Sequence, residues 1–181
     1  MRLSNERYEK IKKKVVGFIK ECGIRSYPID IKNICEKLGC KLLTYSMLDI
    51  EDREFVMDKS EDGYILTDEK GIVGICYNDL EYCDRITTTI AHEIGHYVLG
   101  HKEHSALAES EADFFAVYLL TPNPVLYKLG VENVFDLWSR FKVSMTLAYN
   151  SWNRLVKWRN NMIRFNLSFK DYEEELYNLI D

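Results

Sequence analysis

The chain has 181 residues, the usual length of one domain, and we expect one compact core with at most a small helical extension. Apolar residues make up 46% of it and charged residues 29%, a composition that excludes a disordered or low-complexity chain. The longest apolar run, residues 114–120, is too short to cross a bilayer, and the N-terminus has no apolar stretch suited to a signal peptide. We therefore expect a cytoplasmic protein without a membrane partner.

The first part of the chain predicts two helices and a strand. Residues 5–21 have the apolar spacing of an amphipathic helix, with lysines on the opposite face. Asp30 is placed to cap a second, short helix that Gly39 ends, and residues 40–45 follow as a strand. We expect the acidic residues 49–62 to form a surface loop, part of which could be helical.

The rest of the chain predicts two strands joined by the polar turn 68–71, and then helices only. These elements are, in chain order, residues 63–67, 72–77, 85–99, 106–120 and 131–181. The order predicts an α+β fold in which a small, mostly antiparallel sheet packs on helices. We place the main domain at residues 1–125 and a helical C-terminal extension, packed on the same core, at residues 126–181.

The cysteines and the charges add two expectations. An odd number of cysteines without CxxC spacing predicts free, mostly buried thiols: Cys22, Cys35, Cys40, Cys76 and Cys83. The formal net charge of −5 argues against a protein dominated by nucleic-acid binding. The charges are uneven, however, because acidic residues gather in residues 49–69 whereas residues 138–164 contain basic residues and no acidic one.

The most informative segment is the HExxH motif of residues 92–96, which lies within a predicted helix. Residues four apart project from one face of a helix, one turn apart, so the imidazoles of His92 and His96 can together hold one Zn²⁺ ion. Glu93 lies about 100° farther round the helix, beside the metal rather than on it. There it can take a proton from the attacking water and later deliver it to a leaving amine, which predicts a metallopeptidase.

A catalytic zinc ion needs a third protein ligand and an open fourth position. Glu109 and Asp113 lie four apart at the start of the next predicted helix and share one face. We interpret Glu109 as the third ligand and Asp113 as the acceptor of a hydrogen bond from the far nitrogen of a ligating histidine. The alternative is that these acids form a solvated first turn favoured by the helix dipole. Glu111 is a competing ligand, but it points about 200° from Glu109, so both cannot serve.

The other histidines do not complete a three-histidine zinc site. His101 follows His96 by five residues, whereas the metzincin motif places its third histidine six residues on, after a glycine that Leu99 replaces. We expect His101 and His104 to lie in a loop. Either of them, or Tyr77, could stabilise the oxyanion of a tetrahedral intermediate.

Taken together, these segments resemble the ImmA/IrrE family of metallo-endopeptidases, a gluzincin-like group. The resemblance covers about residues 30–158 and is dense over residues 78–122. The residues and motifs that carry it are Asn78, Arg85, the run 91–96, Glu109-x-Glu-Ala-Asp-x-Phe-Ala116, Leu119-Leu-Thr-Pro122 and Phe141-x-Val-Ser144. Thr121 stands where the family often has methionine, a difference that we expect to leave the chemistry unchanged.

This resemblance implies a zincin-like fold, one zinc ion per chain held by His92, His96 and Glu109, and catalysis by Glu93. It further implies cleavage of a helix-turn-helix transcriptional repressor, often one encoded beside the protease on a mobile genetic element or in a stress-response locus. The implied role of the chain is therefore transcription regulation through proteolysis.

Two segments leave alternatives open. Strand 72–77, if it lies at the edge of the sheet, could align an extended peptide substrate through main-chain hydrogen bonds. Residues 138–164 interleave basic and aromatic side chains, a pattern that also occurs in nucleic-acid-binding proteins. The alternative function is a non-proteolytic regulatory or nucleic-acid-binding protein on a zincin-like scaffold. The acidic net charge and the helical spacing of the aromatic residues favour a buried face with a solvated basic side instead.

Overall fold

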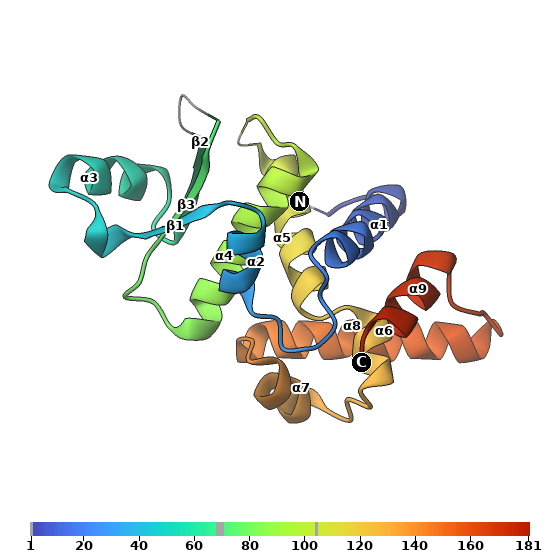
Figure 1. Cartoon of the computed structure of the whole chain (residues 1–181). Helices are drawn as coiled ribbons and strands as arrows, with labels where there is room; N and C mark the ends of the chain where they lie inside the picture. The colour runs from blue at the N-terminus through green and yellow to red at the C-terminus, as the bar shows by residue number, and fades with distance from the viewer. Residues whose placement is uncertain (1, 68–70, 104) are drawn as a thin grey trace. The chain divides into compact units, whose positions relative to one another are not determined.

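The computed structural model describes residues 2–67, 71–103 and 105–181 (Figure 1). The chain forms two compact units. The first is built from Asp30–Ala116 with the first few residues of the chain, and the second from Ser4–Ile29 and Val117–Asp181. The turn expected at residues 68–71 is described only at Gly71, and His104 lies outside the described residues.

A three-stranded sheet lies in the first unit. Its strands are β1 (Lys41–Thr44), β2 (Gly63–Thr67) and β3 (Val73–Tyr77). Strand β3 is central and pairs in parallel with β1 and antiparallel with β2, so the fold is α+β as expected and the sheet is mixed. The register sets Ile75 of β3 opposite Leu42 and Ile65, which places aliphatic side chains of all three strands side by side.

The central place of β3 corrects the expectation about an edge strand. Residues 72–77 were a candidate edge for a peptide substrate, but β3 has a neighbouring strand on both sides. Strand β3 is central because β1 pairs with it in parallel. The sequence pattern of residues 63–67 and 72–77 shows only that these two strands are neighbours in the chain, and it does not reveal the pairing with β1. Among the described residues, β2 pairs only with β3, and it is the edge strand that packs against helix α4.

The other described elements of the first unit are helical. They are α2 (Ile31–Lys37), the 3-10 turn η1 (Tyr45–Met47), α3 (Ile50–Lys59), α4 (Cys83–Leu99) and α5 (Ala106–Leu120), whose last turn belongs to the second unit. In Figure 1, α3 lies beside the sheet and α4 runs against it. The helix ends agree closely with the sequence pattern, and α4 stops at Gly100, which adopts the left-handed conformation with φ 74°.

Helix α3 forms where a surface loop was expected, so only the helical alternative for that segment is correct. The Asp49 side chain accepts a hydrogen bond from the Asp52 backbone N–H at 3.0 Å and thereby caps the helix. Val56, which is buried, packs with Tyr45 and Cys76 against the sheet. This single anchor explains why the segment is helical although its sequence lacks an amphipathic pattern.

Helices α4 and α5 approach each other closely because small residues face each other where they touch. A Cβ atom added at Gly95 would lie 3.2 Å from the Cα and O atoms of Ala112 and from the Cβ atom of Phe115. Ala112 is itself fully buried. The glycine of the HExxH motif therefore allows the face of α5 that carries Glu109 and Asp113 to reach the histidines of α4.

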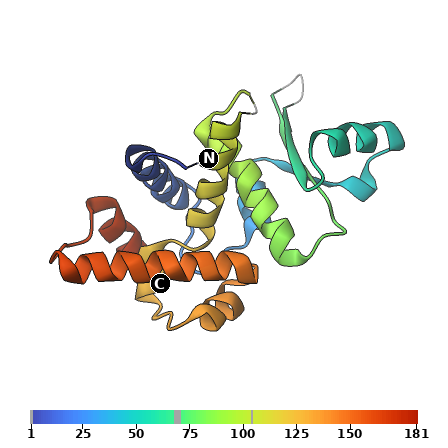
Figure 2. The same cartoon turned by 180° about the vertical axis from the view of Figure 1, so that it is seen from behind.

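The second unit is helical, as the sequence predicts. Besides the last turn of α5, its helices are α1 (Asn5–Glu21), α6 (Asn123–Lys128), α7 (Val134–Phe141), α8 (Met145–Arg164) and α9 (Asp171–Leu179). Figures 1 and 2 show α1 and α9 side by side. At this contact the Glu9 carboxylate accepts hydrogen bonds from Lys170 and from the Tyr172 hydroxyl, the latter at 2.8 Å.

Arg154 of α8 ties the end of α5 to the next helix. Its Nε donates to the Asn123 side-chain oxygen at 3.0 Å, and a terminal nitrogen donates to the carbonyl of Thr121. The guanidinium also lies over the Tyr118 ring, 5.7 Å from its centroid. Burial lowers the pKa of Arg154 to about 10. This residue, one of the basic side chains that suggested nucleic-acid binding, therefore serves an internal structural role.

Two further observations concern expectations made from composition. Cys22, Cys35, Cys40 and Cys76 are buried free thiols and Cys83 is exposed, which confirms the expectation for the cysteines. No helix in the described part of the chain combines the length and the hydropathy needed to cross a bilayer. The boundary at residue 125 and the cytoplasmic location stay predictions.

Candidate metal centre

Helix α4 presents the two motif histidines toward one point. His92 and His96 are one turn apart, and their Nε2 atoms lie 2.9 Å from each other. The His96 side chain is only 4% exposed, because α5 and the loop after α4 cover it. Both rings therefore turn the same nitrogen to the same place, as the helical spacing predicts.

Glu109 of α5 adds a carboxylate to this pair. Its two oxygens lie 3.3 Å from Nε2 of His92 and 3.6 Å from Nε2 of His96. Tetrahedral zinc, with ligands at about 2.0–2.1 Å, separates its ligand atoms by about 3.3 Å, so the three side chains fit such an ion with small shifts. The three donor atoms lie within 4.8 Å of one another and could hold a metal ion. Three protein ligands leave a fourth position for water or substrate.

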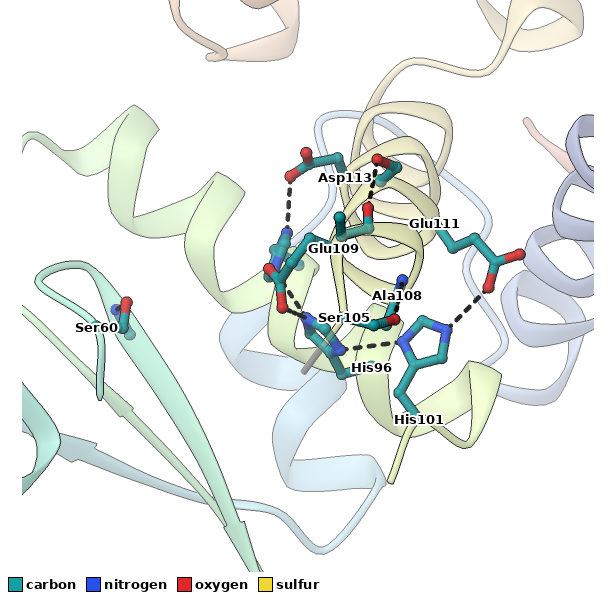
Figure 3. A network of polar contacts seen from close by, with 12 residues as sticks. Ser60, His96, His101, Ser105, Ala108, Glu109, Glu111 and Asp113 are labelled. Carbon is teal, nitrogen blue, oxygen red and sulfur yellow. Dashed lines mark hydrogen bonds and ion pairs between the residues drawn. The ribbon is translucent and has the colours of Figure 1, made fainter. Parts of the chain in front are cut away.

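Asp113 lies one turn after Glu109 on α5 and contacts the other side of the His92 ring. Its carboxylate is 2.9 Å from Nδ1 of His92 (Figure 3). Burial lowers the pKa of His92, but the hydrogen bond to Asp113 and the nearby carboxylates outweigh burial and raise the pKa above its ordinary value. The proton sits on Nδ1 when it is donated to Asp113, which leaves the Nε2 lone pair of a neutral His92 for a metal.

Two of the three residues suggested for oxyanion stabilisation lie among the described residues. His101 does lie in the loop after α4, but both of its ring nitrogens contact side chains, Nδ1 that of His96 and Nε2 that of Glu111. Tyr77 is buried, and Lys32 Nζ lies 5.9 Å from its ring centroid. His104 is outside the described residues. Any oxyanion role of these residues stays a prediction.

A cavity of about 460 Å³ opens in front of the three donor side chains. Glu93 lines it, next to His92 and His96, and the carboxylate side chain is mostly buried. The first residue of β2, Gly63, lines the cavity on the sheet side. A Cβ atom there would lie 2.4 Å from Cγ2 of Thr89, so the strand can approach α4 this closely only with glycine at this position.

Sequence reasoning missed some residues that line this cavity. Tyr64 lines the cavity. Tyr77, the tyrosine suggested from the sequence, is not among the described residues that line it. Thr89 also lines the cavity, and its place three residues before His92 on one helix could have indicated this. Arg85 joins α4 to the segment before β2 through an ion pair with Asp62 at 2.6 Å, a contact that no sequence spacing reveals.

Comparison with known protein families bears directly on this geometry. The family model described as the IrrE N-terminal-like domain, of the M78 peptidases, matches residues 35–153. The chain belongs to the M78 (ImmA/IrrE) peptidase family. The match confirms the family resemblance, spans both α4 and α5, and agrees with an α+β, zincin-like fold. No curated protein matches the chain.

The M78 family is a family of metallopeptidases, and a metallopeptidase requires a metal centre. In the described residues of this M78 chain, one group of at least three histidine, cysteine or acidic residues converges closely enough to hold an ion: His92, His96 and Glu109. The cavity in front of them is the place where a substrate could meet a metal.

Proposed function

We propose that this M78 chain is a zinc-dependent endopeptidase in which His92, His96 and Glu109 hold the zinc ion and Glu93 is the catalytic residue. The observation that carries this proposal is the convergence of two imidazole nitrogens and a carboxylate at the wall of a cavity that Glu93 also lines. Two histidines and one glutamate are a ligand set used by zinc proteases. Membership of a metallopeptidase family supports the same assignment.

The chain's own residues then divide the work. A bound Zn²⁺ ion supplies Lewis acidity, which makes a water molecule more acidic and polarises a peptide carbonyl. Glu93 takes the proton of the attacking water and delivers it to the leaving amine. Asp113 holds His92 in the tautomer that presents Nε2.

A peptide substrate needs to lie extended across the cavity, and β2 offers a place for it. This strand has a neighbour on one side only among the described residues, and Gly63 and Tyr64 at its start line the cavity. An extended segment that adds to the free side of β2 would run past the metal centre. We infer that β2, rather than β3, aligns the substrate.

The family supports a protein substrate, and we propose that this substrate is a helix-turn-helix transcriptional repressor. The ImmA/IrrE resemblance implies this substrate class. Such a repressor is cytoplasmic, so the protease would act in the same compartment. The test is to incubate the repressor encoded nearest to this chain with the purified protein and zinc, and to locate cleavage by mass spectrometry. A folded repressor that stays uncut under these conditions would contradict this substrate.

Substitution of Glu93 tests the catalytic role. Glu93→Gln should keep one zinc ion per chain but lower the cleavage rate by at least about 100-fold, because the amide cannot accept the proton. His92→Ala should lose both the zinc ion and the cleavage. Metal analysis of the purified variants and a cleavage time course measure both effects. Cleavage by Glu93→Gln at the rate of the parent would show that another group is the base.

The alternative function, nucleic-acid binding without proteolysis, can be tested separately. Arg154, one of the basic residues behind that hypothesis, is occupied by contacts to Thr121 and Asn123. Nucleic-acid binding through phosphate contacts would weaken strongly with salt. A DNA mobility shift at low salt that disappears at higher salt would support the alternative, and its absence at low salt would exclude it.

A further inference from the structure

The chain reverses direction after α4 and brings His101 back onto the helix. Gly100 adopts the left-handed conformation with φ 74°, and the backbone N–H of His101 donates to the carbonyl of His96 at 3.0 Å. This turn places the His101 ring next to the His96 ring, with 5.0 Å between their centroids. The position of His101 is thus set by the cap of α4 and not by a flexible loop.

The His101 ring lies between His96 and Glu111 (Figure 3). Its Nδ1 is 3.0 Å from Nδ1 of His96, and its Nε2 is 3.1 Å from Oε2 of Glu111. The side chains of His101 and Glu111 are only 12% and 16% exposed, so water competes weakly for these contacts. Glu111 comes from α5, on the side of that helix away from Glu109.

The contacts allow one consistent placement of protons when His96 binds a metal. Its Nε2 must then be unprotonated, so the proton of the neutral ring is on Nδ1. That N–H donates to Nδ1 of His101, which must therefore be unprotonated. The proton of His101 is then on Nε2 and is donated to the carboxylate of Glu111. Each donor faces one acceptor along the whole chain of hydrogen bonds.

We propose that His101 and Glu111 are positioning residues that hold His96 in the ring orientation and tautomer needed for metal binding. This inference rests on the proposed function, in which His96 is a zinc ligand. His92 receives the same support directly from Asp113, whereas His96 receives it from Glu111 through a second imidazole. Helix α5 thus supplies three carboxylates. Asp113 supports His92, Glu111 supports His96 through His101, and Glu109 is the third ligand. Hydrogen-bonded partners of metal ligands raise the affinity for the metal about 10- to 100-fold.

Substitutions at position 101 test this role through the zinc affinity. His101→Phe keeps a planar ring but cannot accept from His96, and we expect its zinc dissociation constant to rise about 10- to 100-fold. His101→Gln offers an oxygen to His96 and an N–H to Glu111, so it should bind zinc within a few-fold of the parent. Competition with a chelating dye measures the constants. The exposed Glu103→Gln, in the same loop, is the control that should leave them unchanged.

A double variant shows whether Glu111 acts through His101. Glu111→Leu alone should weaken zinc binding, but adding it to His101→Phe should cause little further loss, because the chain is already broken. If the two residues acted independently, the two losses in zinc affinity would multiply. Losses that multiply would exclude the proposed order of contacts, even if each single variant weakens zinc binding.

Proton positions in the zinc-loaded parent give a second test that needs no substitution. Nitrogen-15 NMR of the histidine rings should show His101 protonated on Nε2 and His96 protonated on Nδ1. His101 protonated on Nδ1, or zinc binding by a folded His101→Phe as tight as that of the parent, would overturn the proposal. If His101→Phe does not fold, the glutamine variant and the NMR spectrum decide. Failure of the parent itself to bind zinc would contradict the proposed function instead.

Discussion

Arg154 is the single residue outside the metal centre whose loss we expect to destabilise the fold most. Its guanidinium satisfies the carbonyl and hydroxyl of Thr121 and the side-chain oxygen of Asn123. Arg154→Met keeps most of the apolar stem but removes the donor to the buried Thr121 carbonyl and Asn123 side-chain oxygen, so we expect a loss of about 2–4 kcal/mol in the free energy of unfolding. Urea denaturation followed by circular dichroism measures it.

Arg159 provides a matched control for that substitution, because it lies on the same helix and its side chain is exposed. Arg159→Met should change the free energy of unfolding by no more than about 0.5 kcal/mol. An equal effect of both substitutions would mean that helix propensity or net charge, and not the buried contacts of Arg154, determines the outcome.

The close approach of helices α4 and α5 determines whether the three proposed zinc ligands can meet. Gly95→Ala would place a methyl group 3.2 Å from the backbone of Ala112, so α5 must move by a few tenths of an ångström. Because α5 carries Glu109, we expect weaker zinc binding together with a loss of about 1–3 kcal/mol in the free energy of unfolding. Thermal unfolding and chelator competition measure the two effects.

A second glycine within a helix serves as the control. Gly17 lies in α1, and an added Cβ atom there would meet nothing within 4 Å. Gly17→Ala should therefore stabilise the protein by about 0.5–1 kcal/mol and leave zinc binding unchanged. A stabilising Gly95→Ala with unchanged zinc affinity would show that α4 and α5 have more room than their contact indicates.

At the scale of the whole molecule, segments from the two ends of the chain meet through Glu9. Burial by itself would raise the pKa of Glu9, but hydrogen bonds from Lys170, Lys12 and Tyr172 lower it from 4.5 to about 2. A carboxylate with a depressed pKa in the folded state stabilises the fold above pH 4.5, and this contribution disappears as the pH falls toward 2. The side chain is partly exposed, and solvent screening reduces the contribution to about 1 kcal/mol.

Glu9→Gln should remove this dependence, since the amide does not titrate. We expect the free energy of unfolding of the parent to fall more steeply than that of the variant between pH 4.5 and pH 2, while the two curves run parallel above pH 5. Urea titrations at a series of pH values measure the difference. Curves that stay parallel down to pH 2 would contradict the assignment of this contact.

Local spacing predicts those features that depend on one helix or strand at a time. The pair His92 and His96 meets because an α-helix repeats every 3.6 residues, and Glu109 and Asp113 share a face for the same reason. The helical second half and the strand 63–67 follow from the period of apolar residues. The helix of residues 50–59 was only an open alternative, because its one buried anchor, Val56, is visible only when the sheet is in place.

Contacts between elements distant in sequence depend on packing, and only the tertiary structure reveals them. The central place of β3, the contact of Gly63 with Thr89, and the internal role of Arg154 each depend on which surfaces touch. Residue identity and spacing along one helix were enough to recognise the family and to predict the metal ligands. The tertiary structure decided that His101 joins His96 to Glu111, because a chain reversal and a second helix must come together before those three side chains can meet.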